Sequence, residues 1–483
     1  MRIKIYSSTK WAVLLSIFFL LWGILIGANA LFVISFIILL NMIFYCWAEI
    51  ETRSILFAFG VTFGVFLVGR EFLQVYLGYQ VEGYSADVNQ HTYICFILSL
   101  LGVWGAYFIA EYYGEKRKHR IVSSNHETNI NEYSFGDNRF TIHVRQWSKV
   151  FFWVSMPLAL TMRIIVALFV STYSYNAYYT DFVELMYGSN IVLYIIGRLE
   201  NLMPVFLGIF ISTLPSKKVA RPVFIVYFVY LIISLGGGNR GTFLLGILYL
   251  FVVIVFMQGI KPEEVWFKRK YMWFLVAMLP VVAITGSVYN TVRWGGSAEI
   301  NSLFQEFVKF FYDQGVTVTV VKHAYEFSDR LPKQHYLLEF MHSGVLARLF
   351  GITVLHGNTV EHALYGGSMN YSLAYVVMGS MYLSGQGTGT SYLAELYYDL
   401  GYFGVLFGNI IYGVLFYRIR DVRTSLFKRA VIFVLMTQLL WAPRGSCTGF
   451  ISFFFAPTTL GALAIVWALA NITTRQESYR INN

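Results

Sequence analysis

The chain has 483 residues, of which 57% are hydrophobic and only 13% are charged. A water-soluble domain carries about 25% charged residues, so this composition excludes a soluble globular fold and predicts a protein embedded in lipid. The formal net charge of +10 could indicate a nucleic-acid partner. However, the positive-inside rule produces basic membrane proteins without such a partner, and the distribution of charge along the chain favours that explanation.

Apolar stretches that can cross a bilayer need about 20 residues, and about twelve such stretches follow one another here. The first two have almost no linker between them, so we expect a retained helical hairpin and not a cleaved signal peptide. Cys46, Cys95 and Cys447 are far apart and predict neither a disulfide framework nor a metal site. The predicted fold is all-α, a polytopic bundle with spans near residues 11–27, 30–48, 54–70, 92–110, 149–171, 189–212, 221–237, 241–258, 271–287, 401–418, 428–443 and 449–471.

The loops between the spans sort by charge. Alternate loops hold most of the lysines and arginines, including the basic run at 116–120, whereas the stretch 171–188 holds none. Basic loops stay in the cytoplasm, so this alternation predicts that both termini are cytoplasmic.

Two loops are long. The later one, 287–400, separates residues 1–286, which contain nine spans, from residues 401–483, which contain three spans and a tail. The polar loop at 111–148 is predicted to be a flexible cytoplasmic connector. The stretch 287–400 is predicted to be a large extracytoplasmic loop, and loops of that length usually have a function. Inside it, an interfacial helix is expected, because five apolar side chains share one helical face: Leu303, Phe304, Phe307, Phe310 and Phe311. The apolar segments 343–354 and 371–383 could dip into the bilayer surface, and 371–383 could be re-entrant.

Charges inside the spans are energetically costly and usually have a purpose. Arg163 lies in the fifth predicted span, and Arg198 and Glu200 lie in the sixth. Residues two positions apart on a helix do not face each other, so Glu200 is expected to pair with Arg163 across helices. Such a pair is either a structural ion pair or part of a polar lining for a substrate cavity.

The glycine-rich turn 236–242 presents Asn239 and Arg240 at the predicted outer membrane surface. An arginine fork there is suited to a diphosphate, which it can bind through two parallel hydrogen bonds. The alternative is a tight turn whose arginine extends to the membrane surface.

The long loop also holds basic residues on the side where the positive-inside rule disfavours them. They are Arg293, Arg330 and Arg348, together with most of the histidines: His323, His335, His342, His356 and His362. A negatively charged substrate would account for them. The histidines lack the short spacing of a zinc site, so no metal is predicted.

A small-residue stretch at 385–391 leads into the tenth span. Glu395 and Asp399 follow it four residues apart, on one helical face, and could bind sugar hydroxyls or act as a general base. The alternative is that they cap and solvate a helix end. Arg444, in the last outer loop, adds one more cation on the same side.

These features resemble the O-antigen and capsule repeat-unit polymerases of bacteria, the Wzy type. The resemblance rests on Gly238-Asn239-Arg240-Gly241 at the start of a span, on Ala394-Glu395-Leu396-Tyr397 with Gly401-Tyr402-Phe403-Gly404, and on many spans with a large late outer loop. It implies a GT-C-like, metal-independent glycosyltransferase in the bacterial cytoplasmic membrane. This enzyme needs no cofactor and lengthens an undecaprenyl-diphosphate-linked glycan by one incoming lipid-linked repeat unit. A chain-length regulator and a flippase are the expected protein partners.

The resemblance also implies roles for individual residues. Outer-face arginines are required in the family, which points to Arg240, Arg293 and Arg444 as groups that bind the diphosphate leaving group. Glu395 or His362 is the candidate general base. Additional substrate contacts are expected from Arg348, Arg330, His356, Asp399 and Asn239.

Two other functions stay open. The related O-antigen ligases have an outer-loop histidine followed eleven residues later by glycine, a spacing that His356 and Gly367 share. A flippase or transporter of lipid-linked oligosaccharide would also suit twelve spans. However, transporters usually show two related halves, and the two halves of this chain are unlike.

Overall fold

The computed structural model describes residues 7–124, 138–173, 182, 191–237, 240–268, 280–281, 284, 286–287, 302–420 and 425–482. Every regular element within these residues is a helix, and eleven helices are long and apolar enough to cross a membrane. They correspond to eleven of the predicted spans. The predicted ninth span, 271–287, lies mostly outside the described residues, as does the middle of the loop 111–148. The all-helical, multi-pass class is therefore confirmed, and the count of twelve stays a prediction.

Up to residue 260, the part of the chain that the structure describes forms ten α-helices and one π-helical turn of five residues. They are α1 (Ser7–Leu25), α2 (Ala30–Ala48), α3 (Ile50–Phe63), the π-helical η1 (Gly64–Val68), α4 (Gly69–Leu77), α5 (Ala86–Ser124), α6 (Arg139–Thr172), α8 (Ile191–Glu200), α9 (Leu202–Ser212), α10 (Lys217–Gly236) and α11 (Arg240–Ile260).

The helices of the second half begin with short elements and end with long ones. They are α13 (Leu303–Gln314), α14 (Thr317–Glu326), the 3-10 helix η5 (Tyr336–His342), α15 (Gly344–Leu349), α16 (Val360–Tyr365), α17 (Met369–Met378), α18 (Ser380–Leu383), α19 (Tyr392–Ile419), α20 (Leu426–Trp441), the 3-10 turn η6 (Ala442–Arg444), α21 (Gly449–Phe454) and α22 (Pro457–Asn482).

Several helices differ from the apolar stretches that predict them. α5 has 39 residues and α6 has 34, so both continue into the loop predicted at 111–148. A span predicted from hydropathy ends where charged residues begin. The helix itself can continue beyond that point, because lysine, arginine and glutamate are good helix formers. The last predicted span, 449–471, is divided into α21 and α22, and Pro457 opens α22 at a position where proline is favoured.

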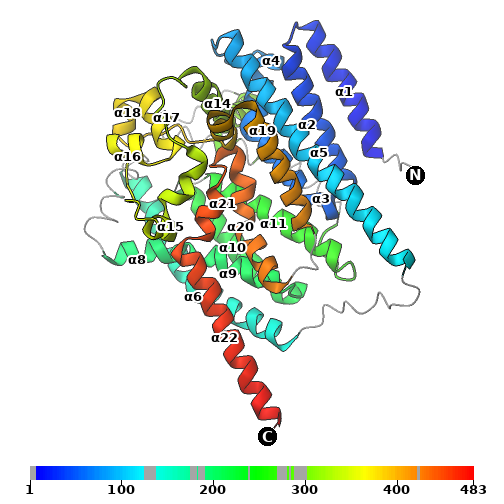
Figure 1. Ribbon diagram of the computed structural model, residues 1–483, viewed down its shortest axis with the longest axis vertical. Helices are drawn as coiled ribbons and strands as arrows, with labels where there is room; N and C mark the ends of the chain where they lie inside the picture. The colour runs from blue at the N-terminus through cyan, green and yellow to red at the C-terminus, as the bar shows by residue number, and fades with distance from the viewer. Residues whose placement is uncertain are drawn as a thin grey trace.

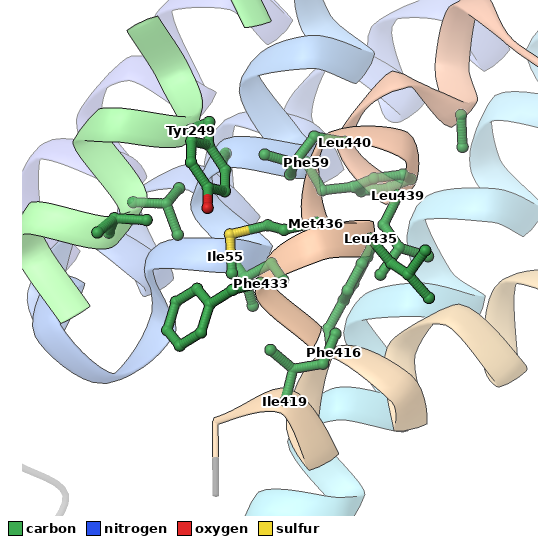
Figure 2. Packing of buried hydrophobic residues seen from close by; sticks show 14 of the residues in the cluster. Ile55, Phe59, Tyr249, Phe416, Ile419, Phe433, Leu435, Met436, Leu439 and Leu440 are labelled. Carbon is green, nitrogen blue, oxygen red and sulfur yellow. The ribbon is translucent and has the colours of Figure 1, made fainter. Parts of the chain in front are cut away.

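The bundle is held by apolar side chains from helices that are far apart in the sequence. Figure 2 shows part of this core, where Phe59 of α3, Tyr249 of α11, Phe416 of α19 and Met436 of α20 converge. α5 and α19 approach closely because glycine lines their contact. A Cβ on Gly102 of α5 would lie 2.9 Å from the carbonyl oxygen of Leu406 on α19. Small residues at such interfaces let helix backbones pack tightly in a membrane.

Residues 302–391, here called the α13–α18 segment, contain short helices of four to twelve residues, and none of them is a candidate membrane span. In Figure 1, α14, α16, α17 and α18 gather at the upper left, far from the C-terminal ends of α5 and α22. The helix predicted from the apolar face of 303–311 is present as α13. Part of this face packs on α4, where Phe307 and Phe311 belong to one apolar cluster with Phe72 and Leu73.

Ionic contacts fasten the α13–α18 segment to the bundle. The Lys322 ammonium lies 2.6 Å from Glu71 Oε1, and both side chains are almost completely buried. The Tyr93 hydroxyl donates a hydrogen bond of 2.8 Å to the other Glu71 oxygen. Arg70, next to Glu71, donates to the Tyr312 hydroxyl of α13 at 2.9 Å.

The predicted ion pair inside the bundle is also present. Arg163 of α6 pairs with Glu200 of α8, and its Nε donates to the Tyr230 hydroxyl of α10 at 3.2 Å. The pairing across helices is therefore confirmed, and the three partners connect three neighbouring helices.

Candidate functional site

The structure does not describe the side chains of three predicted site residues. Asn239 and Arg293 are outside the described residues, and Arg240 is described only as the first residue of α11, without its side chain. The site is therefore built from the other residues and from the backbone at the start of α11.

Arg444 is held at a junction of three chain segments. Its Nη1 donates to the carbonyl oxygen of Gln314 at 3.4 Å and to the side-chain oxygen Oε1 of the same residue at 3.3 Å. Gln314 is the last residue of α13, and the carbonyl end of a helix carries partial negative charge. The guanidinium carbon also lies 5.4 Å from the centre of the Phe66 ring and 5.7 Å from the Trp441 ring. These contacts hold the guanidinium in one place.

Trp441 connects Arg444 to the start of α11. A Cβ on Gly241 would lie 2.8 Å from Cη2 of Trp441, so only glycine permits this approach. Arg240 is the residue before Gly241, and its backbone therefore lies beside the same tryptophan. We call this junction of Arg444, Trp441, Phe66, Gln314 and Gly241 the arginine corner. The corner therefore contains Arg444 and the glycine that follows Arg240.

Glu395, on the first turn of α19, is completely buried. Its Oε1 accepts a hydrogen bond of 2.8 Å from the Thr390 hydroxyl. Its Oε2 accepts from the Ser446 hydroxyl at 3.1 Å and from the backbone N–H of Cys447 at 2.7 Å. The carboxylate therefore joins the 385–391 stretch to the turn that follows Arg444.

Asp399 lies one turn further along α19, before Gly401, whose backbone interrupts the helix. Its two oxygens accept hydrogen bonds from the backbone N–H groups of Tyr336 at 3.2 Å and Leu337 at 2.8 Å. Asp399 thus caps the first turn of η5, whose N–H groups have no partner within the helix. The sequence leaves a capping role open for Asp399, and the helix that it caps is η5 and not α19, on which it lies.

His362 has the geometry of a proton acceptor. Its Nδ1 lies 2.8 Å from the carbonyl oxygen of Gly357, so Nδ1 carries the hydrogen, and Nε2 of the neutral ring is the acceptor. The ring stacks on Tyr371, with 3.7 Å between ring centres. Burial lowers the pKa of His362 below 6.5, and the ring is therefore neutral at neutral pH.

The remaining predicted residues are dispersed over the α13–α18 segment. His356, Arg330 and Arg348 are exposed, and the Arg330 guanidinium lies 5.2 Å from the centre of the Phe327 ring. The spacing of His356 and Gly367 stays a prediction. A Cβ on Gly367 would meet the ring of His342, with 2.7 Å to Cδ2.

Glu339 is an additional candidate that the sequence analysis misses. Its Oε2 is buried without a hydrogen-bond partner, which is rare in native structures and often marks a functional group. Its negative charge raises the pKa of His362, against the larger effect of burial. The available signal in the sequence is one acid within the apolar run 336–341.

The described residues contain no group of three or more histidine, cysteine, aspartate or glutamate side chains that could hold a metal ion.

The comparisons identify one family. The family model described as O-antigen polysaccharide polymerase Wzy matches residues 9–477, which include the arginine corner and the whole α13–α18 segment. No curated protein and no solved structure matches the chain. Because the match covers nearly the whole sequence and the fold is a multi-pass helical bundle, the chain belongs to the O-antigen polysaccharide polymerase Wzy family, whose members act in polysaccharide biosynthesis in membranes.

Proposed function

We propose that the protein polymerises undecaprenyl-diphosphate-linked oligosaccharide repeat units into O-antigen or capsular polysaccharide. The reaction takes place at the outer face of the bacterial cytoplasmic membrane, with both termini in the cytoplasm. A hydroxyl of the incoming unit attacks the anomeric carbon of the growing chain, and a new glycosidic bond forms. The bond to the lipid diphosphate breaks, the diphosphate leaves with the electron pair, and the hydroxyl proton passes to a base.

The arginine corner carries this proposal. The diphosphate gains negative charge as it leaves, so a cation that is already in position lowers the barrier. Arg444 is fixed by the end of α13 and by two aromatic rings, and one of these rings, Trp441, also approaches Gly241, the residue after Arg240. Arg444 and Arg240 are assigned to the diphosphate, together with Arg293. A fork of this kind offers paired hydrogen bonds that a lysine cannot supply.

His362 is assigned as the general base for the acceptor hydroxyl. Its Nε2 is an acceptor in the neutral ring, and the neutral form dominates because burial lowers its pKa. Exposed side chains of the α13–α18 segment, among them Arg330, Arg348 and His356, are assigned to the glycan. The segment would then contact the sugars while the arginine corner binds the carrier.

The test uses purified protein in liposomes with lipid-linked repeat units, and the products are separated by length. Wild-type protein is expected to give a ladder of lengthened chains. Arg444→Ala should lower the rate on the order of 10²-fold, because it removes a preorganised donor to the leaving group. Arg444→Lys should restore little of this rate, because one ammonium does not replace the fork. Arg240→Ala and Arg293→Ala should likewise abolish lengthening while single-repeat glycan persists.

Arg475→Ala is the matched control, since this arginine is exposed on α22, outside the arginine corner, and should keep the ladder intact. A ladder that survives Arg444→Ala would remove Arg444 from the reaction. Transfer of finished glycan to another lipid, without lengthening, would identify a ligase. Movement of labelled glycan across the bilayer without lengthening would identify a flippase.

A further inference from the structure

Glu395 lies between the small-residue stretch 385–391 and the turn that follows Arg444. Thr390, on one side, belongs to the stretch 385–391. Ser446 and Cys447, on the other side, belong to the turn directly after Arg444. One completely buried carboxylate accepts hydrogen bonds from all three residues.

The contacts of Glu395 do not suit a general base. A base must reach the hydroxyl proton directly or through one water. Here three donors from the protein occupy both carboxylate oxygens, and the side chain has no exposed surface. The same contacts are those expected of a residue that fixes the position of a loop.

Two other side chains, one directly before α19 and one within it, hold the same loop. The Ser391 hydroxyl donates to the carbonyl oxygen of Pro443 at 3.0 Å, and the Tyr412 hydroxyl donates to the carbonyl oxygen of Cys447 at 2.8 Å. Arg444 lies between these attachment points. Glu395 accepts hydrogen bonds from a side chain and from the backbone of this turn, and its loss would leave three hydrogen-bond donors without this acceptor.

We propose that Glu395 is a positioning residue, which fastens the turn 445–447 to α19 and thereby holds Arg444 in the arginine corner. The activity measurements that test this inference rest on the proposed function, whereas the thiol-labelling measurement does not. Because the same carboxylate also binds Thr390, it keeps the 385–391 stretch in register with Arg444. Displacement of a catalytic group by about 1 Å can cost on the order of 10²-fold in rate, so such a fastening has kinetic consequences.

The first experiment compares Glu395→Gln with Glu395→Ala. Glutamine keeps an oxygen for Ser446 and Cys447, and its amide can donate to Thr390, so the turn stays attached. A positioning role therefore predicts a rate within about threefold of wild type for Glu395→Gln and a loss on the order of 10²-fold for Glu395→Ala. A general base would lose its activity in both variants, and that result, in well-folded protein, would overturn the proposal.

The second experiment asks whether Glu395 acts through Arg444. In a double-mutant cycle, Glu395→Ala should add less than about twofold to the loss caused by Arg444→Ala, because both changes remove the same interaction with the diphosphate. Additive losses would contradict the proposal. Asn409→Ala is the matched control, since Asn409 is a buried polar residue of α19 that binds Tyr392 and Ser99. Its effect should combine additively with Arg444→Ala.

The third experiment requires no polymerase activity. Cys447 is buried, and its backbone N–H is bound by Glu395, so its thiol should react slowly with a membrane-impermeant maleimide. In a background where Cys46 and Cys95 are serine, Glu395→Ala should accelerate labelling of Cys447 at least about tenfold, by the same loosening that lowers the rate. Glu395→Gln and Asn409→Ala should not. Equal labelling of all variants would overturn the proposal, whereas failure of wild-type protein to lengthen glycans would overturn only the proposed function.

Discussion

The transmembrane bundle and the α13–α18 segment are held together by different forces. The bundle has one large apolar core, in which rings and aliphatic chains from α3, α11, α19 and α20 meet. The α13–α18 segment adds small apolar clusters, and besides the apolar packing of α13 and α14 on the bundle it is attached by polar contacts that the core lacks. Examples are Lys322 with Glu71, and Asp399 with the first turn of η5.

This difference follows from the surroundings of each region. Lipid tails are as apolar as leucine, so helices in a bilayer associate through close packing and not through the hydrophobic effect. Hydrogen bonds and ion pairs are directional, and they fix a segment in one orientation. The segment proposed to contact substrate is therefore attached by the interactions that position side chains best, and breaking them should have specific effects.

The largest effect is expected for Lys322→Met. This change leaves the buried carboxylate of Glu71 without its cationic partner, and removing one partner of a buried ion pair typically lowers the free energy of unfolding by about 3–5 kcal/mol. Thermal unfolding of the purified protein in detergent should show a clear loss of stability. The double variant Glu71→Gln with Lys322→Met should recover part of it, because no charge is then left unpaired. Lys333→Met, at an exposed lysine of the same segment, is the control. Equal unfolding of Lys322→Met and Lys333→Met would show that the ion pair does not support the segment.

A smaller effect is expected in the bundle for Phe59→Ala. Phe59 is completely buried and contacts the rings of Tyr392, Tyr412 and Phe416. In water-soluble cores such a change costs about 3–5 kcal/mol, of which part is the transfer of the side chain from water. In a bilayer that part is largely absent, so we expect a loss below about 3 kcal/mol in the same unfolding measurement. A loss larger than that of Lys322→Met would reverse the proposed ranking of the two regions.

Hydropathy predicts the spans because lipid offers no hydrogen bonds. Every spanning segment must therefore pair its backbone N–H and C=O groups internally and present apolar side chains. The pair of Arg163 and Glu200 is predictable for a related reason, since charges inside apolar spans have few possible partners. Periodicity also predicts α13, whose apolar residues share one face.

Contacts between distant turns are not accessible to the same arguments. Glu395 binds Ser446 and Cys447, which follow it by 51 and 52 residues, and no local pattern connects these positions. For the same reason the sequence leaves two roles open for Asp399, whose partners precede it by 62 and 63 residues. Sequence therefore predicts which residues face the outer surface, whereas their roles depend on how the loops pack.

A modest and local effect is expected for Asp399→Ala. Losing a capping carboxylate typically costs about 1 kcal/mol, and the N–H groups of Tyr336 and Leu337 would lose their acceptor. Hydrogen exchange should become faster at these two amides, with little change in the bundle. Asp399→Asn keeps one acceptor oxygen, so its exchange rates should lie between those of the wild type and Asp399→Ala. Unchanged exchange in Asp399→Ala would mean that η5 is held by its packing alone.

The smallest effect at neutral pH is expected from titration of His362, whose role as a base nevertheless predicts a definite profile. Burial lowers its pKa below 6.5, although the charge of Glu339 opposes this and the nearby His342 and His356 support it. The base is active when neutral, so the rate should be constant above pH 6.5 and fall about tenfold per pH unit only below the lowered pKa. The same pKa shift stabilises the folded state above pH 6.5, and this contribution is lost as the pH falls, since the unfolded chain takes up the proton first.

His362→Gln should slow lengthening at all pH values and remove the fall in rate at low pH, which is called the acid limb. An acid limb that persists in His362→Gln would assign the proton transfer to another group, and Glu339, with its unpartnered oxygen, would be the first to replace by glutamine.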